Sequence, residues 1–230
     1  MNPELLNKIH QGDCKDFMQT LPDGCIDLIV TDPPYDISDS KPGNSELMSL
    51  GKYNAENFAE LTNGFDVEVI FSELVRISKK VNFFIFCANK QIAEIMTIAQ
   101  RGGYYVTLLV WNKTNSAPFA NGVWRQDAEF IVHVRESGAY FEGNAEQKRK
   151  VIQFPTNPSQ FGHPTEKPIE LIKKYIQIGS KEGDTVFDPF MGSGTTALAA
   201  KLMKRNFIGC EIQEKYVAIA NERLRQDYLF

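Results

Sequence analysis

The feature that most constrains this chain is its alternation of short apolar runs of strand length with segments of helical periodicity. Residues 26–30 form a β-branched run that two prolines stop, and proline cannot continue a central ladder. Residues 66–76 instead space their apolar side chains along one face of a helix. Chains that alternate in this way build a mostly parallel sheet with helices on both faces, so we expect an α/β fold.

The same criteria predict the other elements. The further strands that we expect are residues 81–86, 105–111, 128–134, 184–187 and 206–209. The further helices are residues 90–100, 168–178, 195–204 and 213–228. Residues 36–64 are rich in Ser, Asn, Gly and Lys, and a connection of this length is usually a working loop or lid. The length favours one domain that spans residues 1–230.

Composition excludes several classes of protein. The four cysteines are scattered without a CxxC pair, and no histidine lies beside them at ligand spacing, so we expect reduced thiols and no metal site. No run approaches the roughly 18 apolar residues of a membrane helix, and the first residues do not resemble a signal peptide. We therefore expect a cytoplasmic protein without a membrane partner. The net charge of -4 means that nucleic acid could be bound only through local basic clusters, such as residues 148–150 and 173–174, and these are equally typical of solvated faces.

Two predicted strands end in unusual segments. Residues 31–35 read Thr-Asp-Pro-Pro-Tyr, and residues 188–196 read Asp-Pro-Phe-Met-Gly-Ser-Gly-Thr-Thr. Ligands of open parallel sheets bind outside the carboxyl ends of the strands, where neighbouring connections leave in opposite directions. If these two strands are adjacent, both segments face one crevice.

The glycine segment lies between a strand and a helix, as a nucleotide-binding turn does. Gly192 and Gly194 would let a ligand approach backbone amides, and the helix that begins near Thr195 offers its amide-rich end. No lysine follows the second glycine and a third glycine is missing, so a phosphate ligand is not favoured. Glu211 ends the next strand, where a carboxylate can bind ribose hydroxyls. Adenosyl recognition and a purely structural turn are both open on this motif alone.

The Asp-Pro-Pro-Tyr segment has the residue types that activation of an amine on a nucleobase requires. Such an amine is a poor nucleophile, because its lone pair is delocalised into the ring. Asp32 and the carbonyl of the proline turn can accept its hydrogens where positive charge develops. Tyr35 can stack on a base that has been flipped out of a duplex, a contact worth about 1–3 kcal/mol.

Together these segments resemble the β-group DNA amino-methyltransferases of restriction-modification systems, phages and cell-cycle methylation. That family has a Rossmann-like, S-adenosylmethionine-dependent methyltransferase fold with a seven-stranded sheet and a circularly permuted order, the catalytic tetrapeptide preceding the cofactor glycines. The permutation requires an edge strand from the N-terminus, which residues 8–10 can supply beside the strand that ends at Glu211. The resemblance assigns catalysis to Asp32, Pro33, Pro34 and Tyr35.

Three further segments carry the resemblance. Residues 163–168 are similar to the segment that holds the methionine part of the cofactor, residues 12–14 to the one that contacts its adenine, and residues 111–113 to a strand end near the target base. The residues that the resemblance assigns to the cofactor are Asp13, Cys14, Thr165, Lys167, Asp188, Pro189, Phe190, Gly192, Ser193, Gly194, Thr195, Thr196 and Glu211. Structural alternatives stay open for several of these residues. Asp13 could instead cap a helix, and Lys167 could cap its own turn. His163 has no catalytic task in this scheme, and Trp111 and Trp124 are equally suited to packing.

The resemblance implies methyl transfer to double-stranded DNA. Asp at the first tetrapeptide position favours adenine N6, whereas Ser there favours the cytosine amine. Cytosine N4, RNA or a protein glutamine stay open as acceptors, as does a DNA- or cofactor-binding module without turnover. Residues 112–162 would be a small DNA-recognition region, residues 36–64 a mobile loop that orders over the flipped base, and the small recognition region suggests a homodimer. A cognate restriction endonuclease is a further partner that the family implies.

Overall fold

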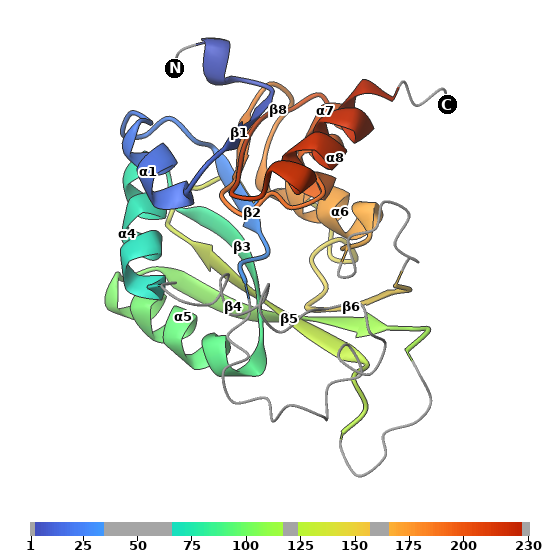
Figure 1. The fold of residues 1–230 in the computed structure, drawn as a ribbon. Helices are drawn as coiled ribbons and strands as arrows, with labels where there is room; N and C mark the ends of the chain where they lie inside the picture. Colours follow the sequence, from blue (N-terminus) through green and yellow to red (C-terminus); the bar gives the residue numbers. More distant parts are fainter. Residues whose placement is uncertain (1–2, 35–65, 117–123, 157–165, 227–230) are drawn as a thin grey trace.

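A twisted sheet forms the centre of the molecule, with helices on both of its faces (Figure 1). The computed structural model describes residues 3–34, 66–116, 124–156 and 166–226. The strand order in the described part is β1-β8-β7-β2-β3-β5-β4-β6, and β5 alone runs antiparallel to its neighbours. The expected α/β class and mostly parallel sheet are therefore confirmed.

The strand bounds agree with the predictions to within about two residues, apart from one added strand. The strands are β1 (Lys8–Gln11), β2 (Leu28–Thr31), β3 (Asn82–Cys87), β4 (Tyr105–Lys113), β5 (Ala128–Arg135), β6 (Val151–Phe154), β7 (Thr185–Asp188) and β8 (Asn206–Glu211). The described sheet thus has eight strands rather than the expected seven. The added strand is β6, whose four residues pair in parallel with the end of β4 inside the predicted recognition region. The sequence did not predict this strand, because four residues are too few for a periodic signal. The segment is a strand because it pairs with β4.

The helices divide into two groups. One face carries α1 (Cys14–Gln19), α4 (Val67–Ile77) and α5 (Asn89–Arg101), and the other carries α6 (Ile169–Gly179), α7 (Thr195–Leu202) and α8 (Glu214–Arg225). A short 3-10 helix, Pro3–Leu5, precedes β1. Pro168 is the N-cap of α6 rather than its first residue. None of the helices in the described residues combines the length and apolar character needed to cross a bilayer.

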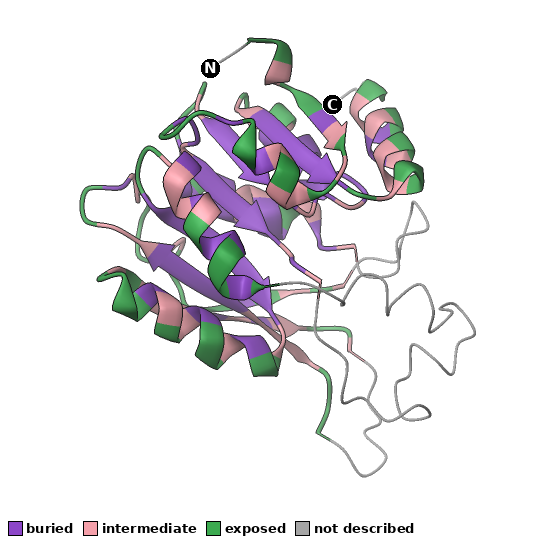
Figure 2. Cartoon of the chain, turned by 60° about the vertical axis from the view of Figure 1, so that its left-hand side comes forward, coloured by how far each residue is buried: buried purple, intermediate pink, exposed green. Residues whose placement is uncertain are grey.

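Two apolar cores follow from the alternation of side chains along the central strands. In β3, Phe83 and Ile85 pack against α4 and α5, whereas Phe84 and Phe86 pack against Tyr175 and its neighbours on α6. Successive side chains of a strand point to opposite faces of the sheet. A strand that is apolar throughout therefore needs helices packed on both faces. Figure 2 shows the resulting pattern, with buried strands between helices that are exposed on their outer sides.

The sheet has its topological switch point between β7 and β2. The connection after β7 forms α7 on one face, and the segment that leads from β2 to β3 includes α4 on the other. Parallel pairing of Leu28 with Val186 and of Ile29 with Phe187 joins the two strands. The prediction that the N-terminus supplies the far edge is also confirmed, because β1 pairs in parallel with β8. The carboxyl ends of β1, β8, β7 and β2 therefore lie along one edge of the sheet.

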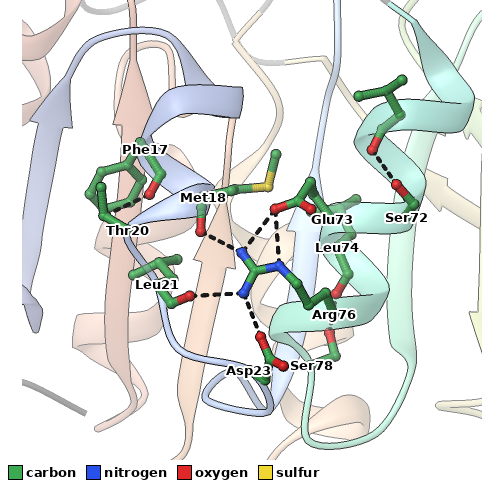
Figure 3. A network of polar contacts seen from close by, with 11 residues as sticks. Phe17, Met18, Thr20, Leu21, Asp23, Ser72, Glu73, Leu74, Arg76 and Ser78 are labelled. Atoms are coloured by element: carbon green, nitrogen blue, oxygen red, sulfur yellow. Dashed lines mark hydrogen bonds and ion pairs between the residues drawn. The ribbon is translucent and has the colours of Figure 1, made fainter.

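Arg76 of α4 binds residues of the segment that precedes β2 (Figure 3). Its guanidinium donates to the carbonyls of Met18 and Leu21, at 2.7 and 2.9 Å, and binds the carboxylates of Asp23 and Glu73, at 2.6 and 2.8 Å. Hydrogen bonds to the two carboxylates raise the pKa of Arg76 above its ordinary value. The planar fork of arginine can serve four acceptors in this way, so this contact fixes two sequence-distant segments on one face.

Candidate active site

The ends of β2 and β7 are joined by a buried hydrogen bond. Thr31 Oγ1 donates to Asp188 Oδ1 at 2.8 Å, and both residues are buried. The two segments picked out from the sequence, which lie more than 150 residues apart, are thus neighbours at the switch point. A small apolar hollow beside them is lined by Thr31, Pro33 and Phe190, together with side chains of α4. The arrangement predicted for the two strand ends is the one observed.

Asp188 is a fully buried carboxyl that organises the start of the glycine segment. Its Oδ1 also accepts from the backbone N–H of Phe190 at 3.1 Å, and the hydroxyl of Thr196 forms a further hydrogen bond. Desolvation by burial raises the pKa of Asp188 to about 6, against the opposing effect of these hydrogen bonds, and the nearby charge of Asp32 adds to the rise. Asp188 therefore holds backbone and hydroxyl groups at the site, and Pro189 continues the buried turn.

The glycine segment is held from the next strand by Glu211. Its Oε2 accepts from the backbone N–H of Gly192 at 2.9 Å, and its Oε1 accepts from that of Gln213 at 2.8 Å. Desolvation raises the pKa of Glu211, while these backbone donors oppose the rise. Gly194 has φ +85° and is the N-cap of α7, so a left-handed residue connects the turn to the helix. The carboxylate predicted to bind a ribose is therefore at the glycine turn and also braces it.

Arg223 of α8 supports the same turn from beneath. Its Nη1 donates to the carbonyl of Ser193 at 2.8 Å, to Ser193 Oγ at 3.0 Å and to Thr195 Oγ1 at 3.2 Å. Its Nη2 forms an ion pair with Glu166 at 2.7 Å, and both side chains are almost completely buried. One cation thus joins the glycine turn to the segment before α6, so the two cofactor segments suggested by the sequence are physically connected.

Asp32 lies at the tip of β2 beside Lys167. The Nζ of Lys167 is 2.5 Å from Asp32 Oδ2 and 3.3 Å from Glu129 Oε2. The proline turn that follows is fixed from α5, because Nε2 of the buried Gln91 donates to the carbonyl of Pro34 at 3.1 Å. Tyr35, Thr165, His163 and residues 36–64 lie outside the described residues.

Asp13 and Cys14 stand at the neighbouring strand tip, after β1. The Asp13 carboxylate accepts from the backbone N–H of Lys15 at 2.7 Å and caps α1, as one of the two interpretations predicted. Gly12 N–H donates to the carbonyl of Glu211 at 3.0 Å, which places Asp13 beside the end of β8. Desolvation, followed by the charge of Asp13, raises the pKa of the Cys14 thiol to about 12. Cys14 is therefore neutral and suited to packing rather than to nucleophilic attack.

Other residues named from the sequence have structural surroundings. Trp111 is buried and donates its Nε1–H to the carbonyl of Phe154 at 2.9 Å, so it is a core residue, whereas Trp124 is 90% exposed. The basic clusters carry acidic partners of their own, since Arg149 pairs with Glu146 and Lys173 with Glu170. These clusters are partly neutralised within the chain.

Sequence reasoning missed three residues that shape the site, namely Gln91, Glu129 and Arg223. Glu129 lies on β5 beside Lys113 and Lys167, with Nζ to carboxylate distances of 2.7 and 3.3 Å. Each of the three belongs to a regular element and reaches a partner at least 28 residues away. A polar residue within a helix or strand gives no local signal for such a contact, so a single sequence could not reveal it.

Comparison with known proteins identifies the family. The family model described as DNA methylase, which covers N6 and N4 enzymes, matches residues 26–222. The chain belongs to this family. The Type II methyltransferase M.HinfI of Haemophilus influenzae is 28% identical and aligns with 97% of this chain and 69% of its own length. The Type II methyltransferase M2.MboI of Moraxella bovis is 26% identical, over 95% of this chain and 87% of its own.

Solved structures agree with this assignment. The complex of M1.HpyAVI with S-adenosylmethionine has a TM-score of 0.71 and 28% identity, covering 95% of this methylase and 99% of its own chain. The PvuII methyltransferase, which is cytosine-N4-specific, has a TM-score of 0.69 at 18% identity and covers 96% of this chain and 87% of its own. This second likeness concerns the fold. The resemblance to DNA amino-methyltransferases of restriction-modification type is confirmed, and the family includes both adenine and cytosine enzymes.

Proposed function

We propose that this methylase transfers a methyl group to the N6 amine of adenine in duplex DNA. The observation that carries the proposal is the Thr31 to Asp188 hydrogen bond, which supports one site for the Asp-Pro-Pro turn and the glycine turn. The family match supports DNA as the substrate. Asp at position 32 favours adenine over cytosine by resemblance to the family.

The residues at the glycine turn fit S-adenosylmethionine, which when bound supplies an electrophilic methyl group on a sulfonium. Gly194 has no room for a side chain, since a Cβ there would lie 2.7 Å from that of Ala220. Glu211, Asp188 and Ser193 are held in place by the contacts described above, and the N-terminus of α7 follows. We propose that Glu211 binds the ribose hydroxyls and that Asp13 lies near the adenine, with Phe190 beside the apolar hollow.

At the other half of the site, Asp32 and the backbone of the proline turn would act on the base. An amine becomes a better nucleophile when acceptors take its N–H hydrogens, because nitrogen gains positive charge in the transition state. The Asp32 carboxylate is one acceptor and the Pro33 carbonyl is proposed as the other. Gln91 fixes the turn by binding the carbonyl of Pro34, which limits how far the acceptors can move. Tyr35 is proposed to stack on the flipped base.

The test is methyl transfer from radiolabelled S-adenosylmethionine to unmethylated genomic DNA. Asp32→Ala should reduce transfer at least about 100-fold, the usual effect of losing a preorganised group that stabilises developing charge. Asp16→Ala, at an exposed position of α1, is the control and should retain activity. Digestion to nucleosides and mass spectrometry should show N6-methyl-2′-deoxyadenosine. Detection of N4-methyl-2′-deoxycytidine in its place would contradict the assignment to adenine. Full activity of Asp32→Ala would contradict the catalytic role of Asp32.

We also propose that two copies associate and that a cognate endonuclease shares the recognition sequence. The named Type II relatives support an enzyme of a restriction-modification system. Light scattering at assay concentrations tests the first proposal, and a fully active monomer would contradict it. Sequencing methylated DNA would identify the recognition site, against which the second can be tested.

A further inference from the structure

Glu129 is a carboxylate that lies between two lysines near the proposed acceptor Asp32. It lies on β5 opposite Trp111 of β4, and its side chain is 21% exposed. Its Oε1 is 2.7 Å from Lys113 Nζ, and its Oε2 faces Lys167 Nζ at 3.3 Å without a hydrogen bond of good geometry. Burial would raise the pKa of Glu129, but the charges of Lys167 and Lys113 outweigh it and lower the pKa. Glu129 is thus a charged carboxylate between two lysines.

Lys167 lies in turn between two carboxylates. Its side chain is 6% exposed, and its ammonium contacts Asp32 on β2 and Glu129 on β5. The ring of Phe86, on β3, lies 5.4 Å from the ammonium. An ammonium buried to this degree stays charged only when it is well paired, because desolvation favours the neutral amine. A chain of alternating charges therefore runs through Lys113, Glu129, Lys167 and Asp32, and it ends at the proposed acceptor.

Asp32 needs such a counter-charge because of its surroundings. The negative charge of Asp32 helps to raise the pKa of Asp188. The two carboxylates, at neighbouring strand ends, therefore repel each other. Repulsion of this kind favours protonation of one member of a pair. A protonated Asp32 would have one carboxyl oxygen fewer to offer as an anionic acceptor. A charged Lys167 beside it opposes that protonation.

We propose that Glu129 is a positioning residue for methyl transfer, which holds the Lys167 ammonium against Asp32 and so keeps Asp32 an anion. The inference rests on the proposed function, and it assigns to Lys167 a role toward the acceptor. Glu129→Gln keeps the shape of the side chain and removes its charge. Lys167 then loses one of the two carboxylates that it contacts among the described residues, so it should lose its proton at a lower pH.

Kinetics give the first measurement. We expect Glu129→Gln to lower kcat about 10- to 100-fold at neutral pH, the effect of losing one charge-assisted contact, with the alkaline limb of the kcat profile moved to lower pH. The KM for S-adenosylmethionine should stay within about threefold. Glu129→Asp keeps the charge and should restore part of kcat, and Glu170→Gln, which removes an exposed carboxylate from its pair with Lys173, should have no effect. Unchanged kcat and pH profile, or a raised KM with unchanged kcat, would overturn the inference.

A second measurement does not depend on turnover. The protein is labelled with ¹³C-lysine, the Lys167 signal is assigned with Lys167→Arg, and its chemical shift is followed against pH. The midpoint at which Lys167 loses its proton should be at least about one pH unit lower in Glu129→Gln than in the parent chain. An equal midpoint would overturn the inference even if kcat falls. If the parent transfers no methyl group to DNA, the proposed function fails, and this titration still decides what Glu129 does to Lys167.

Discussion

Replacement of Gly194 by alanine tests how closely the glycine turn depends on its contact with α8. Gly194 has φ +85°, and an added Cβ would lie 2.7 Å from Ala220 Cβ and 3.1 Å from Ala220 Cα. Gly183, in the turn before β7, has the same φ of +85°, and an added Cβ there meets nothing within 4 Å. The two substitutions therefore impose the same backbone strain, and only one of them adds a collision.

The magnitudes follow from this difference. A left-handed conformation costs a residue with a Cβ about 1–2 kcal/mol, partly offset because alanine restricts the unfolded chain, so Gly183→Ala should destabilise by about 1 kcal/mol. Overpacking a close-packed contact costs about 1–3 kcal/mol more, which gives about 2–4 kcal/mol for Gly194→Ala. At roughly 2–4 °C per kcal/mol for a chain of this size, the second variant should melt about 4–16 °C below the parent.

Urea unfolding of the parent and both variants is the assay, with S-adenosylmethionine binding measured by calorimetry. Gly194→Ala should also bind the cofactor at least about tenfold more weakly, because α7 and the turn must move apart from α8. An Ala220→Gly background lacks the colliding methyl group, so Gly194→Ala should cost clearly less there than in the parent, although the Cα of residue 220 keeps its 3.1 Å contact with the added Cβ. Equal destabilisation by the two single substitutions would refute the argument, as would failure of Ala220→Gly to relieve the difference.

Three further predictions concern buried and partly buried charges. Arg223→Met removes the cation that pairs with the buried carboxylate of Glu166, so it should cost about 3–5 kcal/mol in urea unfolding, whereas Glu166→Gln with Arg223→Met should cost less. Burial lowers the pKa of His133 to about 3, below its ordinary 6.5. The unfolded chain therefore binds more protons between these values, and the stability that His133 contributes, present above pH 6.5, should fall by about 2 kcal/mol on going from pH 7 to pH 5. A His133→Gln chain should lack this part of the pH dependence, and equal slopes would contradict it. Arg76→Lys keeps the charge but cannot serve four acceptors, so a loss of about 1–3 kcal/mol is expected in thermal unfolding, and parental stability would show that geometry at this position is unimportant.

The sequence by itself determined most of the elements and placed the two unusual motifs at strand ends. Apolar runs and helical periodicity identified six of the eight described strands and five of the six main helices, all but α1. Those signals are local, because they depend on residues two to four positions apart. The two strand-end motifs predicted that Asp32 and Asp188 belong to one site, and the structure places the two strand ends side by side. The permuted order even required the edge strand that β1 provides.

Only the tertiary structure decided which groups meet. Lys167 reaches Asp32 across 135 positions, and the alternating charges that include Glu129 depend on the antiparallel strand β5 returning beside β3 and β4. The strand β6 likewise exists through its pairing with β4. Such contacts arise when packing brings distant segments within a few ångströms, and their energy depends on burial and on partners that a local pattern does not contain. The sequence thus specified the proposed acceptor and the glycine turn, and the packed sheet specified the charges that surround them.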